Sequence, residues 1–469
     1  REEMEEGVFD MRKKQSGETR LLSILMAATL LMTAGCSSGE PQEDTGQALE
    51  NDSAQETSTS PDALRVCLVD RDVGDLDAAL ESFKKKYPDI NVELETISVD
   101  NLEAEKARAS SELMAGEGCD LYYYVENLLE DPYKAQQAGA FADLVPLLEE
   151  YTELTPEDFA DGTFDTLENG EECYIIPLLQ SFPLFVIRKD MQEKLGITTD
   201  SWKRIQDLRS ILDAFYEMYP GEDPFSPYES FNPGMEYYGF RIWQGTDNVG
   251  ILNEADWKGG LDIMKETRYP EGTYNGLQVG EMPEDYEKKD QEDEKIYQNQ
   301  IPCLGKEMSS ADNLEIYIRM GGEADADLFP EYDAQGQISS FGLRGIAISE
   351  SSQRKTDAIR LAQEIIMHNI SVGIQMSTWK EGNQILLENL RQQYGSGEVA
   401  LNGKVYPGLT DATFEKLETF INQAIPYYPV YVDVQTHIGT YMEEYLQGKV
   451  SYEEFMKKVE DYLEIYYSE

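Results

Sequence analysis

Six charged, amide or aromatic residues lie at or just beyond the end of an expected β-strand. They are Asp70, Arg71, Asp72, Tyr124, Glu126 and Asn127. Carboxylate, amide and guanidinium groups hydrogen-bond to polar molecules, and aromatic rings cover flat C–H faces. Ligands of α/β sheets bind in the loops at the carboxyl ends of parallel strands. These residues therefore predict one side of a binding site for a polar small molecule. The alternative is structural, with Asp72 capping the next helix and Tyr124 in the core.

Four further candidates come from later segments of the chain: Gln180, Trp243, Arg344 and Trp379. The chain has only four tryptophans, and two of them stand in polar surroundings. Trp243 lies in Arg-Ile-Trp-Gln-Gly and Trp379 in Ser-Thr-Trp-Lys-Glu. An indole beside polar groups is suited to stack on a guest molecule. The alternative for each tryptophan is to pin a loop onto its own part of the protein.

Sequence patterns of well-known catalytic and metal sites are missing. The sequence has no phosphate-binding GxxxxGK[ST], no GxSxG and no HExxH. The run from Asp70 to Glu81 resembles a calcium loop, but Asp75 stands where that loop needs glycine. We therefore expect no catalytic residue, no metal ion and no cofactor. Because the chain has 91 acidic residues, the carboxylate pair of a glycosidase stays an alternative.

Alternating strand and helix patterns precede and follow the first candidates. Residues 63–69 form an apolar strand candidate, and residues 76–87 have apolar positions at helical spacing, with Asp75 as the expected N-cap and Pro88 as the stop. A strand at 90–94, a helix at 101–115 and a strand at 119–125 follow. This alternation predicts a parallel sheet with helices on both faces.

The rest of the chain is also of α/β type. An apolar run at 174–187 is broken by two prolines, which favours a segment that passes between two lobes. A strand is expected at 341–349, with a helix after it. The last hundred residues are helical in pattern, and Ser451–Glu454 is a capping box that opens the final helix.

The composition limits the partners. The formal net charge is −52, and a strongly negative surface repels the phosphates of nucleic acids, so a nucleic acid partner is excluded. Besides Cys36, four cysteines occur, at 67, 119, 173 and 303. They have no metal-ligand spacing. We expect buried thiols, with a disulfide between Cys67 and Cys119 as the alternative that an exported protein allows.

The N-terminal part indicates export. The apolar run 21–35 follows basic residues and, with 15 residues, is shorter than the roughly 20 that a membrane-spanning helix needs. Thr33–Cys36 resembles the lipobox of bacterial lipoproteins, which implies cleavage before Cys36 and acylation of its thiol. Residues 1–10 precede Met11 and are interpreted as an upstream extension. Polar residues at 36–62 predict a flexible tether.

Four segments in this order resemble the extracellular solute-binding proteins of bacterial ABC importers, in particular the sugar-type family 1. They are Ala79–Leu94, Gly118–Tyr122, Gly345–Ala358 and Gly448–Phe455. The resemblance implies a two-lobed periplasmic-binding-protein-like fold of type II. Each lobe would be a mainly parallel sheet flanked by helices, and crossing segments would form a hinge. It also implies capture of a small solute by closure of the lobes.

The resemblance implies a domain division and a role. The expected parts are an extension with signal peptide at 1–35, a tether at 36–62, an N-terminal lobe at 63–180 with 340–372, and a C-terminal lobe at 181–339 with 373–469. We expect a monomeric, non-enzymatic, lipid-anchored receptor on the extracytoplasmic face of the cell membrane, which delivers a solute, most simply an oligosaccharide, to permease subunits. A lipid-anchored glycosidase and a glycan-binding adhesin are the alternatives.

Overall fold

The structure is a computed structural model. It describes residues 62–164, 172–198, 207–220, 242–244, 249–251, 258–263, 265, 306–307, 312–332, 336–395, 397–401, 403–427 and 432–468. All of them belong to one compact unit of the chain, formed by Pro61–Asn275 and Asp290–Glu469. The expected signal, Cys36 and nearly all of the tether lie outside the described residues, as does Cys303.

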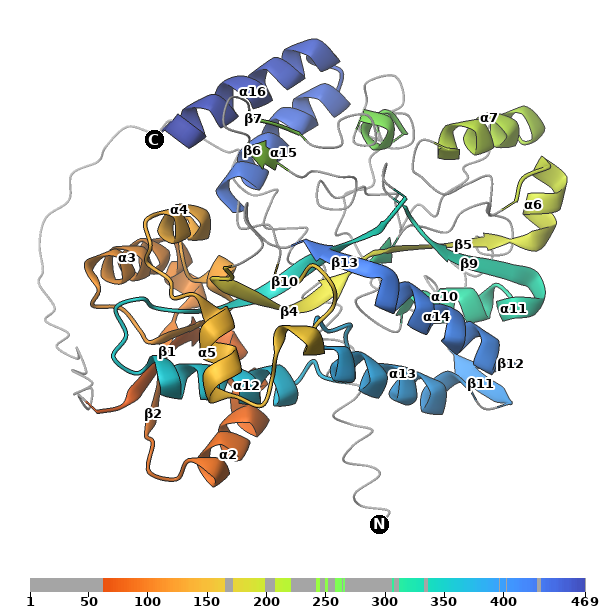
Figure 1. Cartoon of the computed structure of the whole chain (residues 1–469). Coiled ribbons are helices and arrows are strands. Elements are labelled where there is room, and N and C mark those ends of the chain that lie inside the picture. Colours follow the sequence, from red (N-terminus) through yellow and green to blue (C-terminus); the bar gives the residue numbers. More distant parts are fainter. Residues whose placement is uncertain are drawn as a thin grey trace, which may run out of the picture. The chain divides into compact units, whose positions relative to one another are not determined.

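The larger sheet confirms the expected α/β start of the chain. Its strands are β1 (Leu64–Val69), β2 (Val92–Ile97), β3 (Leu121–Tyr123), β4 (Ile175–Ser181), β10 (Ile338–Ile348) and β13 (Ala424–Tyr427). The order is β13-β10-β3-β1-β2, and β4 pairs with β10. β1 is parallel to both β2 and β3, and β10 is parallel to β13, whereas β10 is antiparallel to β3 and β4. Figure 1 shows this mixed sheet.

Strand β1 is buried on both faces. Leu64, Val66 and Leu68 belong to one hydrophobic cluster, whereas Cys67 and Val69 belong to another. Because successive side chains of a strand point to opposite faces, the two clusters lie on the two sides of the sheet. Helix α12 (Lys355–His368) packs against α2 (Asp77–Lys86) and α5 (Leu144–Tyr151), while α3 (Leu102–Ala115) packs against β2. Parallel strands that are covered on both faces are typical of α/β folds.

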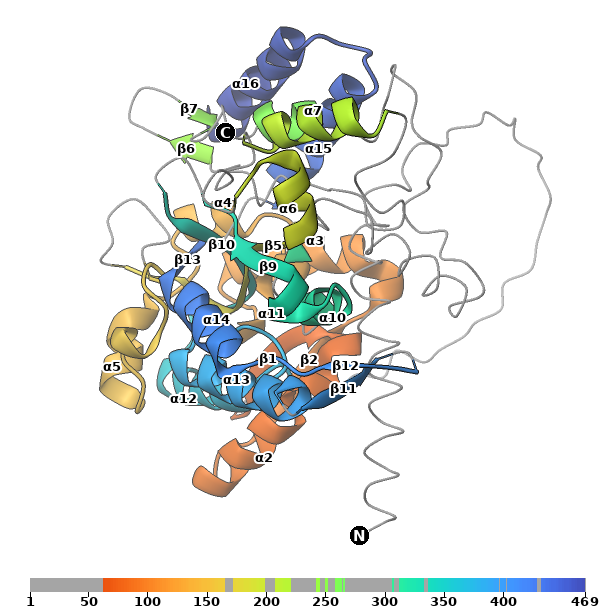
Figure 2. The same ribbon diagram turned by 90° about the vertical axis from the view of Figure 1, so that its right-hand side faces the viewer.

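A smaller sheet contains β8 (Lys306–Glu307), β5 (Pro183–Arg188) and β9 (Ala326–Pro330) in that order. Both of its strand pairs are antiparallel, which differs from the mainly parallel sheet that we expected for the second lobe. Figure 2 shows β5 beside β9. Further helices of this part of the chain are α6 (Lys189–Leu195), α7 (Leu208–Met218), α10 (Asp312–Arg319), α11 (Gly322–Asp325), α13 (Lys380–Tyr394) and α14 (Asp411–Gln423).

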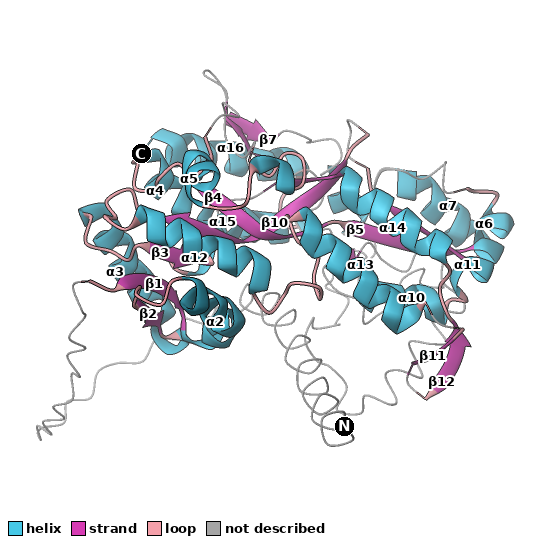
Figure 3. Ribbon diagram, turned by 60° about the horizontal axis from the view of Figure 1, so that its bottom comes forward, coloured by secondary structure: helices cyan, strands magenta, loops and turns pink. Residues whose placement is uncertain are grey.

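The two sheets are connected by one continuous segment. Strand β4 pairs with β10 in the larger sheet, β5 pairs with β9 in the smaller one, and only Phe182 separates them. The expectation that the proline-broken run passes from one part of the fold to the other is therefore confirmed. Figure 3 shows β4 and β10 side by side. Within β10, residues 338–341 pair with β13 and residues 346–348 pair with β3.

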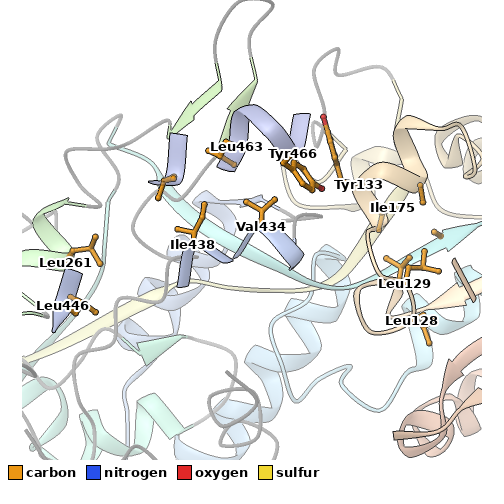
Figure 4. Packing of buried hydrophobic residues seen from close by; sticks show 14 of the residues in the cluster. Leu128, Leu129, Tyr133, Ile175, Leu261, Val434, Ile438, Leu446, Leu463 and Tyr466 are labelled. Atoms are coloured by element: carbon orange, nitrogen blue, oxygen red, sulfur yellow. The ribbon is translucent and has the colours of Figure 1, made fainter. Parts of the chain in front are cut away.

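The chain ends in the helices α15 (Val432–Leu446) and α16 (Tyr452–Ser468), which pack against each other. The predicted capping box is confirmed, because the Ser451 N–H donates to Glu454 at 2.9 Å and the Glu454 N–H donates to the Ser451 hydroxyl at 3.2 Å. Figure 4 shows Val434 and Ile438 of α15 in one apolar cluster with Leu463 of α16.

The remaining elements are short. They are α4 (Pro132–Gln137), β6 (Ile242–Gln244) paired with β7 (Val249–Ile251), and β11 (Glu398–Leu401) paired with β12 (Lys404–Pro407). Within the described part of the chain, no helix is both long enough and apolar enough to span a bilayer.

Candidate functional site

Four of the predicted site residues, Asp72, Tyr124, Glu126 and Arg344, lie together, with Arg344 at the centre. Arg344 of β10 donates a hydrogen bond from Nη1 to the Tyr124 hydroxyl at 2.6 Å, and its guanidinium carbon lies 4.7 Å from the centre of the Tyr124 ring. The carboxylate of Glu126 accepts hydrogen bonds from the backbone N–H groups of Arg344 at 2.8 Å and Gly345 at 3.0 Å. The charge of Arg344 also lowers the pKa of Asp72. We call Asp72, Asp75, Tyr124, Glu126, Arg344 and Ser371 the Arg344 cluster.

The backbone is strained at the centre of this cluster. Among the described residues, Tyr124 with φ 62° and Arg344 with φ 60° are the only non-glycine residues in the left-handed region. Such a conformation costs on the order of 1 kcal/mol or more per residue and is kept where surrounding contacts over-determine it. For Arg344 these contacts are the two hydrogen bonds around Glu126. The strained conformations fix the positions of both side chains.

The left-handed conformation of Tyr124 also places its ring. Neighbouring residues in a strand normally point to opposite faces of the sheet. Here the rings of Tyr123 and Tyr124 stack at 3.8 Å between their centres, and the Tyr123 hydroxyl donates to the Tyr124 hydroxyl at 2.5 Å. Both residues are buried, with 0% and 2% of their surfaces exposed. Tyr124 therefore holds the Arg344 guanidinium and offers no open face to a guest.

Asp75 does not cap helix α2, so that expectation is wrong. The N-cap position is occupied by Leu76, without a side-chain capping bond. A 3₁₀ turn at Asp70–Leu76 shifts the start of the helix, and the Asp75 carboxylate points to the cluster instead. Its Oδ2 accepts from the Tyr124 hydroxyl at 3.2 Å and lies 3.7 Å from Arg344 Nη1. Burial raises the pKa of Asp75, while Arg344 and Tyr124 act against this rise.

Asp72 has a buried oxygen without a partner. The residue is 8% exposed, and its Oδ2 has no hydrogen bond among the described residues. Oδ1 lies 3.8 Å from Arg71 Nε, which is too long for a hydrogen bond. Burial raises the pKa of Asp72 to about 6; Arg71 lowers it and Asp75 raises it further. A buried acceptor without a donor is costly, so Asp72 is the group of the cluster whose hydrogen bonding is least satisfied.

The sequence reasoning missed several members and neighbours of the cluster. Ser371 follows α12, and its hydroxyl accepts from Arg344 Nη1 at 3.1 Å. Lys106 of α3 reaches the Glu126 carbonyl oxygen at 3.5 Å, and burial lowers the pKa of its ammonium group. No local signal marks Ser371, because it lies 27 residues after Arg344 in a turn.

Charged groups of both signs occur in the cluster and around it. Asp72, Asp75 and Glu126 lie in the cluster with the Arg344 guanidinium, and Arg71, Lys106 and Glu103 are charged neighbours. Such a mixed set of donors and acceptors can hydrogen-bond to a polar guest. No group of side chains that could hold a metal ion occurs in the part of the chain that the structure describes.

Two predicted residues beside the cluster have peripheral positions. Asp70 is exposed at the beginning of the 3₁₀ turn. Asn127 is half-buried, and its N–H donates to the Tyr124 carbonyl at 2.8 Å, so its backbone closes the turn that carries Glu126. Their side chains remain predicted contacts of the guest.

The structure does not bring Gln180 and Trp379 into this cluster. Gln180 is 1% exposed, and its amide donates to the Ser377 carbonyl at 2.9 Å and accepts from the Ser340 hydroxyl at 2.7 Å. Trp379 precedes α13, is 4% exposed and belongs to a hydrophobic cluster. These positions favour the packing alternative for Trp379. Trp243 lies in β6, and its side chain is outside the described part.

The comparisons with known proteins agree with this architecture. Residues 72–275 match the family described as bacterial extracellular solute-binding protein. The sugar-binding protein MalE from Xanthomonas citri has a TM-score of 0.57 at 14% identity, with 85% of this chain and 95% of that chain covered. No curated protein matches the sequence significantly.

A second solved structure has the same relation to this chain. It is a proposed oligosaccharide periplasmic-binding protein from Synechococcus sp. MITs9220, with a TM-score of 0.52, 14% identity, and 87% of this chain and 99% of that chain covered. At such identities the solved structures show the fold alone. The expected α/β fold of the two-lobed binding proteins is thus confirmed.

Proposed function

Because residues 72–275 match the bacterial extracellular solute-binding proteins and the chain has the fold of the sugar-binding MalE, we propose that it captures an oligosaccharide without changing it chemically. The Arg344 cluster provides one side of the binding site. Closure of the two parts of the fold around the solute completes the site. Delivery of the solute to permease subunits and anchoring through a lipid on Cys36 complete the proposal.

The observation that carries this proposal is the Asp72 oxygen that has no hydrogen-bond partner, in a cluster that also contains the Arg344 guanidinium. A sugar hydroxyl is a neutral donor that can hydrogen-bond to this oxygen once closure of the fold around the solute moves the segments that cover it. The neighbouring groups, Arg344 and Ser371, are already engaged with each other and with Tyr124. The cluster is therefore rigid before a solute arrives, and a preorganised site loses less entropy when it binds.

A thermal-shift panel tests the proposal. Maltotriose, maltohexaose, cellotetraose and xylotetraose are added to the purified chain, and the melting temperature is measured. A ligand at about a hundred times its Kd adds about 2.7 kcal/mol of stability, which corresponds to an upward shift of a few degrees in a protein of this size. Mass spectrometry of the same mixtures then follows the glycan. Shortened products point to the glycosidase, and unchanged glycan together with a shift supports capture.

Two matched variants test whether a thermal shift comes from binding at the Arg344 cluster. Asp72→Asn alters the buried acceptor, and Asp70→Asn makes the same chemical change at an exposed neighbour. We expect Asp72→Asn to weaken binding about 10-fold or more, since one hydrogen bond to a charged acceptor contributes about 1.5–3 kcal/mol. Asp70→Asn is expected to change affinity less. Equal affinities of the wild type and Asp72→Asn would remove Asp72 from the site.

A further inference from the structure

Two cysteine side chains converge on one carboxylate at the edge of the larger sheet. Cys67 of β1 is the register partner of Glu95 in β2, so their side chains lie next to each other on the same face. Cys119, just before β3, has its sulfur 3.4 Å from Glu95 Oε2. Both thiols are free and belong to the same buried cluster, with 2% and 3% exposure.

Hydrogen bonds from several residues hold the groups around these two cysteines in place. The N–H of Cys119 donates to the Tyr122 hydroxyl at 3.1 Å. Glu95 receives hydrogen bonds from Arg65 at 2.5 Å and Arg108 at 3.2 Å. Burial alone would raise the pKa of Glu95, but these two cations hold it below its usual value. When the thiol of Cys119 is lost, Glu95 loses that hydrogen bond but keeps those from Arg65 and Arg108.

We propose that Cys67 and Cys119 form a disulfide that links β1 to the segment before β3. Both cysteine side chains lie beside the same Glu95 carboxylate on one face of the sheet, and this proximity is what a disulfide between them requires. The bond would join the two strands whose carboxyl ends carry Asp72 and Tyr124, and so would hold the two halves of the Arg344 cluster in register. The inference rests on the proposed extracytoplasmic location for its oxidant, since disulfides persist there.

The reaction is thiol–disulfide exchange with an oxidised dithiol or glutathione disulfide, R–S–S–R. One cysteine sulfur attacks it, forms a mixed disulfide and releases R–SH, which takes the proton of the attacking thiol. The second cysteine sulfur then displaces the second R–SH. The two cysteines lose two hydrogens and two electrons in total, and R–S–S–R is reduced to two R–SH. The neighbouring Cys67 thiol and burial raise the pKa of Cys119, which slows exchange in the folded state.

Cys173 provides the matched comparison. It is also buried, but it belongs to the cluster on the other side of the sheet, and its thiol donates to the Ile175 carbonyl at 3.3 Å. We therefore expect Cys173 to stay reduced under conditions that link Cys67 and Cys119.

Peptide mapping tests the inference on the full chain. The protein is reduced, denatured and refolded in a buffer of reduced and oxidised glutathione, so that burial does not limit access. It is then denatured with N-ethylmaleimide, digested and measured by mass spectrometry. We expect one cross-linked pair with Cys67 and Cys119, lighter by two hydrogens than the separate peptides, and an alkylated Cys173. If Cys67 and Cys119 are both alkylated in the refolded protein, the proposal is overturned.

Variants and stability give a second readout. Cys173→Ser should keep the cross-link, and Cys67→Ser should leave Cys119 alkylated. The bond closes the loop from residue 67 to residue 119 and so lowers the entropy of the unfolded chain. The oxidised wild type should therefore melt about 5 °C higher than the reduced wild type. Cys67→Ser should show no such difference. A wild type that forms the cross-link and melts lower would show that the native register does not accommodate the bond, and would overturn the proposed role.

Discussion

Replacement of Asp72 by Asn should stabilise the solute-free protein at neutral pH. Asp72 is 8% exposed, and burial raises its pKa from the ordinary 3.8 to about 6. The unfolded chain therefore releases the proton at lower pH than the folded protein does. At pH values below the pKa that Asp72 has in the unfolded chain, Asp72 is protonated in both the folded and the unfolded state. Its burial then costs no ionisation free energy. As the pH rises through the two pKa values, the folded state loses stability relative to the unfolded one.

The magnitude follows from the two pKa values. At ~1.36 kcal/mol per pKa unit, the difference between about 6 and 3.8 gives about 3 kcal/mol above pH 7. The attraction of Arg71, at 3.8 Å, already lowers this pKa, so its loss in the variant is contained in the difference. The amide of Asn has the size of the carboxyl group and is uncharged. We expect Asp72→Asn to gain about 3 kcal/mol at about pH 7.5 and to lose most of this gain near pH 4.

Urea unfolding of the wild type and the variant at several pH values measures this difference. The large net charge of −52 makes both proteins pH-dependent, but this effect is common to both and cancels in the comparison. Asp70→Asn removes the same charge from an exposed position and should change stability by less than about 0.5 kcal/mol at any pH. A difference between wild type and Asp72→Asn that does not change with pH, or a variant that is less stable near neutrality, would refute the reasoning.

Three further substitutions test the site and its surroundings. Arg344→Ala should destabilise the protein by about 3 kcal/mol, because it leaves the Asp75 carboxylate without its cation. Arg344→Lys should recover only part of this loss. If urea unfolding shows no loss for either variant, Arg344 does not hold the cluster together. Glu126→Gln should cost about 1–2 kcal/mol, because the two backbone N–H groups donate to different oxygens of Glu126 and an amide has only one acceptor oxygen. An unchanged melting temperature would speak against this role of Glu126. Trp379→Ala should lower the stability of the solute-free protein by about 3–5 kcal/mol, since the residue is 4% exposed. A variant with a normal melting temperature but without solute binding would instead support Trp379 as a residue that stacks on the solute.

The local pattern of the sequence was sufficient for most elements of the described fold. Apolar runs and helical spacing predicted β1, α2 and α3, and the capping box at Ser451 was predicted with its bonding partner. These features depend on residues that are close in the chain, so periodicity and capping rules reach them. The antiparallel smaller sheet was not predicted, because strand direction depends on pairing between distant segments.

The sequence by itself determined the types of residue at the site, that is, carboxylates and an aromatic ring after two strands. Only the tertiary structure decided their roles. Tyr124 and Arg344 are 220 residues apart, and their contact depends on two left-handed backbone conformations that no short pattern encodes. Asp75 is a second example: the sequence predicted a helix cap at this residue, but its carboxylate accepts a hydrogen bond from Tyr124 in the cluster. Burial and charge pairing are properties of the folded neighbourhood, because they depend on what distant segments place around each group.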